Sequence, residues 1–328
     1  MEQRIFTINN NDSFINLALD TFFYQYENNE VYNLWCRHLN INIDNVTNIE
    51  DIPFLPIEFF KTHNVVTGKW KDEAFFQSSG TTNAGHSIHH IKSLSLYIKS
   101  FVNNFEFFFG DIKQYCFLAV LPSYVSNPHS SLIFMIDYLV KITSDNGSKF
   151  YNEDFNTLLE TIACNEEKGQ KTILFGVTYA LLDIIKYCNS KEIIPKRLNN
   201  TFIFETGGMK GKRKEMPKEE LHSVLCEGFG VKTICSEYGM CELLSQAYSL
   251  ENGIFKVPPQ MRIVLRDIND PLSFTTGRGV INVIDLANIY SCSFIATSDL
   301  GEIKDVQTFK ILGRLDNSDI RGCNLLYF

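Results

Sequence analysis

The sequence lacks the cysteine and histidine patterns of a zinc site and the apolar core of a secretion signal. Its nine cysteines contain no CxxC pair, are scattered through apolar segments and are odd in number, which is typical of reduced intracellular thiols. The N-terminus, Met-Glu-Gln-Arg-Ile-Phe-Thr, has no signal core. The longest apolar runs, 116–121 and 132–140, are too short to span a bilayer. We therefore expect a cytoplasmic protein without a membrane span.

Positive charge is also in short supply. The chain has 30 Lys and Arg residues against 38 Asp and Glu residues, a formal net charge of -8, which argues against a surface that coats nucleic acid. This balance suits a small-molecule or protein partner. A content of 45% hydrophobic and 21% charged residues is typical of a soluble globular enzyme, and 328 residues are enough for two domains or one large domain with subdomains.

Two common phosphate-binding motifs are missing, but one candidate loop is present. The sequence has no Walker ending Gly-Lys-Ser/Thr and no GxGxxG. It does have an aromatic approach, Phe75-Phe76, that stops at small hydroxylated residues and glycines over 78–87. The amides and hydroxyls of such a loop can converge on an anion. An ordinary solvent-exposed loop has the same composition, so this stretch alone leaves both interpretations open.

The order of the apolar segments predicts an α/β fold. Residues 1 to about 50 favour helices, with Asp12 or Ser13 as a cap. Beyond them, buried strands that mostly end at glycine alternate with helices; we expect strands over 115–122, 171–176, 200–208 and 232–239, and helices over 93–108, 130–142, 154–164, 178–188 and 218–228. This alternation is typical of a doubly wound sheet, in which ligands bind beyond the carboxyl ends of the strands.

The pattern changes after residue 250. Short β-branched segments without helices between them predict a small β-subdomain, with strands over 261–265, 279–285, 293–297 and 309–312. The expected organisation is therefore an α/β core over 1–250, a β-subdomain over 251–312 and a short tail over 313–328.

Four small-residue turns stand out together, and the motif Gly313-Arg314-Leu315-Asp316 follows the last of them; the turns are 78–85, 206–208, 236–242 and 297–301. Their order and spacing resemble the adenylate-forming superfamily of acyl-CoA synthetases and luciferases. Within it, 52–60, 205–213 and 236–248 are most similar to the acyl-protein synthetase branch of bacterial bioluminescence, with the phenylacetate-CoA ligases as nearer relatives than the insect luciferases. The resemblance covers nearly the whole chain. It implies the large N-terminal domain of these enzymes, with doubly wound sheets and a small β-subdomain.

The resemblance also implies a reaction, in which a carboxylate attacks the α-phosphate of ATP to give acyl-AMP and pyrophosphate. Each turn then has an expected partner: the pyrophosphate end of ATP for Ser78, Ser79, Gly80, Thr81 and Thr82; adenine for Gly207, Gly208 and Tyr238; the nucleotide in general for Gly239; the α-phosphate for Cys241; Mg²⁺ for Glu242; the ribose hydroxyls for Asp299; and the ribose and phosphate for Arg314. Residues without these roles would instead be a capping glutamate, a core tyrosine, a surface turn and a surface arginine.

The chain departs from the family pattern at several positions of these motifs. Asn83 replaces the usual glycine, Gly85-His86 replaces Pro-Lys, and Cys241 replaces threonine, whose hydroxyl is the better donor. The basic run 210–214 is either a solvated face or a surface that steers ATP or a phosphopantetheine carrier. Four histidines show no partner in the sequence and are interpreted as structural: His89, His90, His129 and His222.

The tail provides a candidate acyl acceptor. Family members continue past the Gly-Arg-x-Asp motif into a lid domain, whereas this sequence ends at Phe328, so we expect the lid domain to be absent. The acyl-protein synthetase branch is likewise short and accepts the acyl group on a cysteine near its end. Cys323 stands there; we expect the neighbouring Arg321 to lower the pKa of its thiol and Gly322 to give the tail freedom to swing.

Three functions remain open from the sequence. The first is ATP- and Mg²⁺-dependent activation of a fatty or aryl acid, followed by transfer to a thiol on the protein, a carrier or an acyl-reductase partner. The alternatives are an acyl-CoA ligase of the phenylacetate-CoA ligase type and a non-catalytic scaffold of an acyl-reductase complex. Several aromatic residues either line an acyl pocket or belong to the core; they are Tyr124, Phe175, Tyr179 and Phe204.

Overall fold

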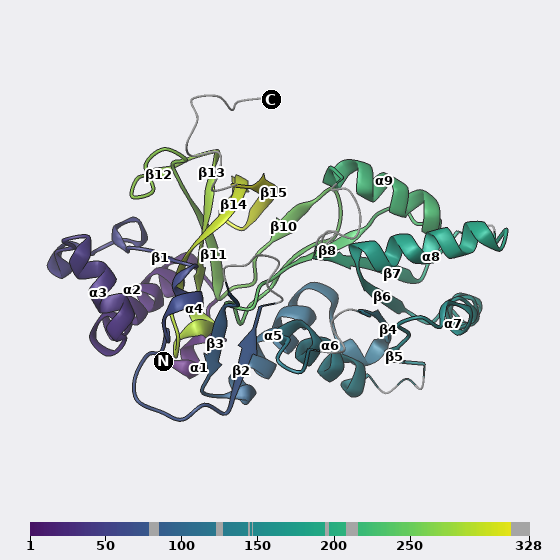
Figure 1. Ribbon diagram of the computed structural model, residues 1–328, viewed down its shortest axis with the longest axis horizontal. Helices are drawn as coiled ribbons and strands as arrows, with labels where there is room; N and C mark the ends of the chain where they lie inside the picture. Colours follow the sequence, from purple (N-terminus) through teal and green to yellow (C-terminus); the bar gives the residue numbers. More distant parts are fainter. Residues whose placement is uncertain are drawn as a thin grey trace.

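A computed structural model of the protein describes residues 1–78, 85–122, 127–143, 145, 147–193, 197–207 and 216–315. Within these residues, one sheet of 13 strands runs through the molecule (Figure 1). Its strands follow the order β12 (Phe274–Thr275), β11 (Met261–Arg266), β13 (Arg278–Asp285), β14 (Phe294–Asp305), β15 (Thr308–Arg314), β10 (Ile254–Lys256), β9 (Ala247–Ser249), β8 (Cys235–Tyr238), β7 (Thr201–Thr206), β6 (Thr172–Val177), β4 (Cys116–Val120) and β5 (Lys149–Phe150), and β1 (Leu55–Pro56) pairs with β14.

The part of this sheet from β5 to β8 is parallel. Every residue of β4 and β6 is buried, as their continuous apolar runs predict. Helices cover both faces: α8 (Thr178–Ser190) and α9 (Lys218–Phe229) lie on one side, and α5 (Leu94–Phe109) and α6 (Ser131–Ile142) on the other (Figure 1). Beyond them, α7 (Phe155–Lys168) leads from β5 to β6 and ends at Gly169, which has a left-handed φ of 69°. The predicted alternation of strands and helices is confirmed here.

The other part of the sheet is antiparallel, beginning at the pairing of β8 with β9. Its far end packs against the N-terminal helices α1 (Glu2–Ile5), α2 (Asn11–Asn28) and α3 (Glu30–His38) (Figure 1). The predicted cap of α2 was wrong by a few residues. Asn10 is the cap, because its side-chain oxygen accepts from the Ser13 amide while the Ser13 hydroxyl accepts from the Asn10 amide.

A separate antiparallel hairpin, β2 (Ala74–Gln77) and β3 (Ile88–Ile91), flanks the small-residue loop. Short helices complete the described elements: α4 (Phe59–Thr62), η1 (Ile43–Asn45), η2 (Ile49–Asp51), η3 (Ile112–Gln114) and η4 (Leu286–Asn288). The sheet continues across residue 250, so the predicted division into a core and a β-subdomain stays a prediction.

None of the described helices combines the length and the apolar character needed to cross a membrane.

Candidate functional site

Three predicted nucleotide residues meet where β8 and β15 end beside the middle of β14. Tyr238 ends β8, and its hydroxyl donates to Oδ2 of Asp299 in β14 at 2.9 Å. Arg314 ends β15 directly opposite Asp299, and its Nε lies 3.8 Å from Oδ1. The Arg314 side chain is 73% exposed, whereas burial raises the pKa of Asp299. The arrangement leaves an exposed guanidinium beside a half-buried carboxyl, which suits the recognition of a polar, anionic ligand.

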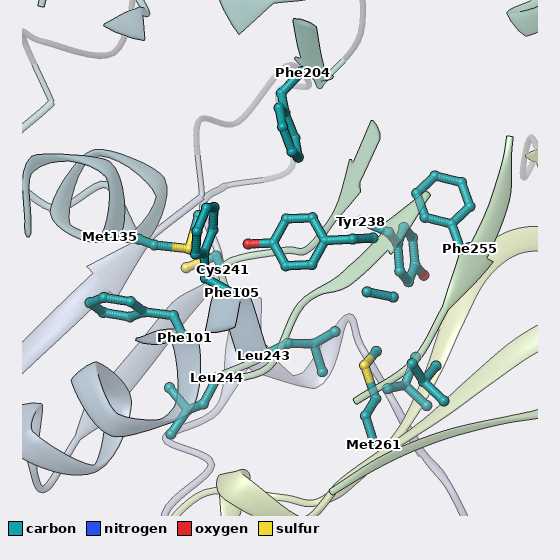
Figure 2. Packing of buried hydrophobic residues seen from close by; sticks show 14 of the residues in the cluster. Phe101, Phe105, Met135, Phe204, Tyr238, Cys241, Leu243, Leu244, Phe255 and Met261 are labelled. Carbon is teal, nitrogen blue, oxygen red and sulfur yellow. The ribbon is translucent and has the colours of Figure 1, made fainter. Parts of the chain in front are cut away.

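The Tyr238 ring is part of the core in this structure. It contacts Phe255 and Phe309 edge-on, with ring centroids 6.0 and 5.6 Å apart. Figure 2 shows the apolar side chains around the turn that follows β8, with Phe101 on one side and Met261 on the other. Stacking of this ring on adenine therefore stays a prediction.

Glu242 lies in the turn after β8 and is only 5% exposed. Burial raises the pKa of its carboxyl, while the Ser87 hydroxyl, the backbone amide of Glu242 itself and the positive charges of Lys61 and Arg314 act in the opposite direction. Arg314 thus lies near both Glu242 and Asp299. A buried carboxylate is an oxygen donor of the kind that Mg²⁺ accepts.

Buried side chains from distant segments hold the backbone of this turn. Nδ1 of His89 in β3 lies 2.8 Å from the Cys241 carbonyl, and Nδ2 of Asn288 donates to the Glu242 carbonyl at 2.7 Å. The Asp285 carboxyl accepts from the amides of Leu244 and Ser245 at 2.9 and 2.8 Å. The sequence gives no spacing signal for any of these contacts. His89, which shows no partner in the sequence, is thus buried and hydrogen-bonded in the structure.

The base of the small-residue loop is tied to the same region. The Ser78 hydroxyl accepts from the Ser87 amide at 2.9 Å, and the Ser78 carbonyl lies 2.7 Å from Nδ1 of His86. Ser87 in turn lies beside Glu242. The other loop residues named above, Ser79, Gly80, Thr81 and Thr82, lie outside the described residues, as does Asn83.

Gly207 follows β7 with a φ of 65°, a left-handed value that favours glycine, and its carbonyl accepts from the Thr178 hydroxyl at 2.9 Å. The same hydroxyl is 3.3 Å from Oε2 of Glu205. The predicted residues Gly208 and 210–214 lie outside the described part of the chain.

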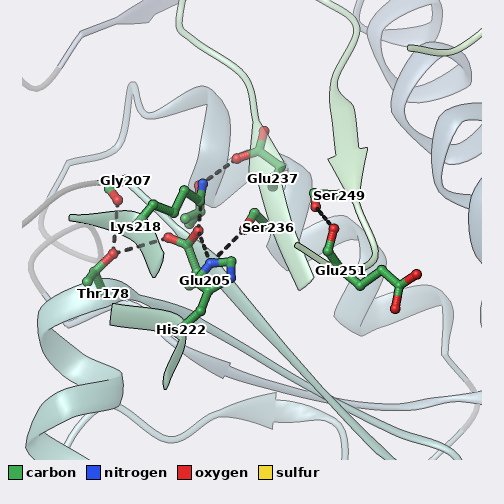
Figure 3. A network of polar contacts seen from close by, with 10 residues as sticks. Thr178, Glu205, Gly207, Lys218, His222, Ser236, Glu237, Ser249 and Glu251 are labelled. Carbon is green, nitrogen blue, oxygen red and sulfur yellow. Dashed lines mark hydrogen bonds and ion pairs between the residues drawn. The ribbon is translucent and has the colours of Figure 1, made fainter. Parts of the chain in front are cut away.

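Glu205 is the centre of a polar network beneath Gly207 (Figure 3). Its carboxyl is 4% exposed; Lys218 Nζ lies 2.9 Å and His222 Nε2 lies 3.4 Å from Oε1. Burial alone would raise the pKa of Glu205, but the hydrogen bond with His222 and the charge of Lys218 outweigh it and hold the pKa at about 2. His222 also contacts the Ser236 hydroxyl at 3.3 Å, so it too has partners that the sequence did not reveal.

Glu237, on the opposite side of β8 from Ser236, is a half-buried acid that the sequence analysis missed. The Thr206 hydroxyl donates to its Oε2 at 2.5 Å, and burial raises its pKa to about 7. A Cβ at Gly239 would overlap Oε1 of Glu237. The absence of a side chain at Gly239 therefore allows the Glu237 carboxyl to lie against the backbone at this position. The pair Thr206–Glu237 links the two strands whose ends carry the predicted adenine turns.

The remaining predicted residues that the structure describes are buried. The Cys241 thiol is buried, and burial raises its pKa well above the ordinary value, so it stays protonated. Phe175, Tyr179 and Phe204 are buried, and the rings of Phe175 and Phe204 stack 5.9 Å apart. They therefore belong to the core. Tyr124 and Cys323 lie outside the described residues.

Two further histidines also have partners. His90 Nδ1 lies 2.6 Å from an oxygen of Asp72, and the His129 ring stacks on Phe75 with centroids 4.1 Å apart. Among the described residues, no group of three or more His, Cys, Asp or Glu side chains is close enough to hold a metal ion.

Comparisons with known proteins agree on one family and one fold. A family model described as acyl-protein synthetase, LuxE, matches residues 7–327. The chain is 22% identical over 334 residues to the long-chain-fatty-acid–luciferin-component ligase of Aliivibrio fischeri, covering 94% of this chain and 86% of the relative. The ligase of the same name from Vibrio harveyi is 22% identical over 331 residues, covering 94% and 85%. A solved open conformation of 2-hydroxyisobutyryl-CoA ligase with 2-HIB-AMP and CoA is similar at a TM-score of 0.65 and 11% identity, over 93% of this chain and 75% of that one. This likeness confirms the predicted α/β fold of adenylate-forming enzymes.

Proposed function

The chain belongs to the acyl-protein synthetase family, and on that basis we propose that it activates a carboxylic acid with ATP and passes the acyl group to a thiol. The relatives named for a long-chain fatty acid support a fatty acid as the substrate. One observation carries the proposal to this chain's own residues. Asp299, Arg314 and Glu242, which come from separate strands and turns, converge beyond the end of β8. Ligands of doubly wound sheets bind at such an edge.

The residues present fit a nucleotide with Mg²⁺. Glu242 offers a hard oxygen ligand, and Mg²⁺ commonly takes one or two carboxylates and completes its shell with phosphate oxygens and water. When bound, the ion neutralises phosphate charge during transfer of the adenylyl group. The charges of Lys61 and Arg314 beside Glu242 act in the same direction.

Each remaining residue then has a definable task. Asp299 has its Oδ2 occupied by the Tyr238 hydroxyl, which fixes the carboxyl and leaves Oδ1 to accept from a ribose hydroxyl. The exposed Arg314 guanidinium can turn from Asp299 to a phosphate oxygen without a desolvation cost. In this proposal Gly207 would bring backbone close to the base, and the loop from Ser78 to Thr82 would contact the pyrophosphate end.

We further propose Cys323 as the acyl acceptor, with an acyl carrier or acyl reductase as the next recipient. The thiolate of Cys323 would attack the carbonyl carbon of the acyl-AMP, forming the thioester and releasing AMP. Arg321 would favour the thiolate and Gly322 would give the tail freedom. A cytoplasmic location stays a prediction from the cysteine pattern.

Pyrophosphate exchange with a panel of fatty and aryl acids tests the activation step. We expect exchange that depends on both the acid and Mg²⁺, and a loss of about a hundredfold or more in Glu242→Gln. The amide keeps the shape and hydrogen bonds of the buried carboxyl, so this variant should fold. If no acid supports exchange at any concentration, the proposal fails and the scaffold alternative replaces it.

Intact-protein mass spectrometry after incubation with ATP, Mg²⁺ and the acid tests the transfer step. We expect one acyl adduct that hydroxylamine removes, and its absence from Cys323→Ser, which should retain full pyrophosphate exchange. An adduct that persists in Cys323→Ser would exclude this cysteine. Release of free acyl-CoA when CoA is supplied, with no adduct, would identify a CoA ligase instead.

A further inference from the structure

The turn that carries Glu242 has little structure of its own. Between the end of β8 and the start of β9 it forms neither helix nor strand, and one internal backbone hydrogen bond joins the Leu243 amide to the Met240 carbonyl at 3.1 Å. Buried backbone groups without such bonds need other partners. Here side chains from β3, η4 and the end of β13 provide them, so the direction of the Glu242 side chain is set from outside the turn.

His89 makes the contact closest to Glu242 in sequence. Its Nδ1 must donate, because the Cys241 carbonyl can only accept, and its Nε2 therefore accepts from the Ser291 hydroxyl at 2.8 Å. Both ring nitrogens of the neutral form are thus satisfied. The ring is 1% exposed and packs edge-on against Phe60, with centroids 5.6 Å apart. Burial lowers the pKa of His89 to about 4, which keeps the ring in this neutral form at ordinary pH.

Ser291 is itself fixed by two side chains. Its carbonyl accepts from the hydroxyl of Thr67 at 2.5 Å and from Nδ2 of Asn29 at 2.8 Å. Asn29 caps α3, so this chain of contacts runs from the N-terminal helices through Ser291 and His89 to the Cys241 carbonyl. A ring held at both nitrogens by fixed groups has one orientation.

The strand β3 therefore holds Glu242 at two points. Ser87 just before the strand and His89 within it are two residues apart, so their side chains project to the same side of the chain. The Ser87 hydroxyl lies beside the Glu242 carboxyl, while His89 binds the carbonyl of the residue immediately before it. The His89 contact orients the peptide plane from which the Glu242 side chain projects.

We propose that His89 is a positioning residue for the adenylation reaction, which fixes the Cys241–Glu242 peptide and thereby aims the Glu242 carboxylate at the nucleotide. This inference rests on the proposed function. The side chains around a metal-binding carboxylate commonly change affinity or activity by about 10- to 100-fold when they are removed.

Two amide substitutions separate positioning from packing. In His89→Asn the amide nitrogen takes the place of Nδ1 and can still donate to the Cys241 carbonyl, but the Ser291 contact is lost. In His89→Gln the amide reaches the place of Nε2 and keeps Ser291, but loses Cys241. Each variant loses one hydrogen bond and some ring volume, so their free energies of unfolding in urea should be similar. Ser291→Ala is a third variant that leaves the His89 ring and its Cys241 contact in place.

Positioning predicts a contrast between the two variants. We expect His89→Gln to lose about 10- to 100-fold in kcat for pyrophosphate exchange and in calorimetric affinity for ATP with Mg²⁺, with the KM for the acid unchanged. His89→Asn and Ser291→Ala should stay within about fivefold of the unmodified protein in both. Equal losses in His89→Asn and His89→Gln, in proportion to lost stability, would overturn the proposal. Absence of exchange in the unmodified protein would instead refute the proposed function, and the inference would fall with it.

Discussion

Glu237→Gln tests whether the carboxyl between β7 and β8 weakens the fold when it ionises. Burial raises the pKa of Glu237 from 4.5 to about 7, despite the hydrogen bond from Thr206. In the unfolded chain the same carboxyl ionises near its ordinary value. The folded state therefore holds its proton more tightly than the unfolded state over this interval, and the free energy of unfolding should fall as the pH rises from 4.5 to 7.

The size of this effect follows from the shift. A change from 4.5 to about 7 corresponds to about 3 kcal/mol if the carboxyl is fully shielded from water. Glu237 is partly accessible to solvent, so we expect about 1 to 2 kcal/mol. The glutamine side chain cannot ionise, yet its oxygen can still accept from the Thr206 hydroxyl. At pH 5 the two proteins should be almost equally stable, and at pH 8 the variant should be more stable by that amount.

Urea unfolding at pH 5, 6, 7 and 8 measures the difference directly. Several titratable groups face Glu237: Glu205 on β7, Lys218 on α9, Tyr97 on α5 and Tyr248 on β9. The pKa of Glu205 is about 2, and burial holds the pKa values of both tyrosines well above 10. These three groups therefore keep the same protonation state between pH 5 and pH 8. Contributions common to both proteins cancel in the difference. A difference that does not change with pH, or a variant less stable than the parent at pH 8, would refute the reasoning.

Three other substitutions probe the surrounding contacts. Glu205→Gln should lower the free energy of unfolding by about 3 kcal/mol at pH 7, because Lys218 and His222 lose the carboxylate that they share. In urea titrations this loss of stability should shrink as the pH falls from 4.5 towards 2, where the carboxylate of the parent protein becomes protonated. A loss that stays constant with pH would contradict this. Gly228→Ala should cost about 1 to 3 kcal/mol in thermal unfolding, because its Cβ would lie 2.6 Å from Cγ1 of Ile185, and Ile185→Ala in the same chain should recover part of the loss. Tyr238→Phe should cost about 1 to 2 kcal/mol of stability and weaken ATP binding in calorimetry, because Asp299 loses its donor; unchanged ATP affinity would count against the ribose role of Asp299.

Local patterns were enough to predict the parallel part of the fold. The apolar runs of β4 and β6 and the helical periodicity of α5 and α8 depend on neighbouring residues, so the sequence shows them directly. The pairing of β8 with β9 was not predictable in the same way. Strand register depends on contacts between distant segments, and nothing in the sequence marks β8 as the strand where the sheet changes direction.

The candidate site divides along the same line. The motifs predicted that Tyr238, Asp299 and Arg314 contact the same nucleotide, although 61 residues separate the first two. His89 could not be found this way, because its partner Cys241 lies 152 residues further along the chain and no spacing rule connects them. Glu205 did leave a signal. A charged residue in an otherwise apolar strand, one step from the glycine turn, indicates a buried carboxyl with partners.

The position of β8 explains why these groups meet. It pairs in parallel with β7 and antiparallel with β9, so it is the junction between the two parts of the sheet. Its successive side chains alternate: Glu237 is bound to Thr206 of β7, and Tyr238 is bound to Asp299 of β14. One strand thus connects the glycine turn after β7 to the Asp299–Arg314 pair in the antiparallel part. A displacement of β8 would move the glycine turn, the Asp299–Arg314 pair and the Glu242 turn relative to one another. The contacts from Thr206 on β7, Asp299 on β14 and His89 on β3 oppose such a displacement, because each comes from a different element.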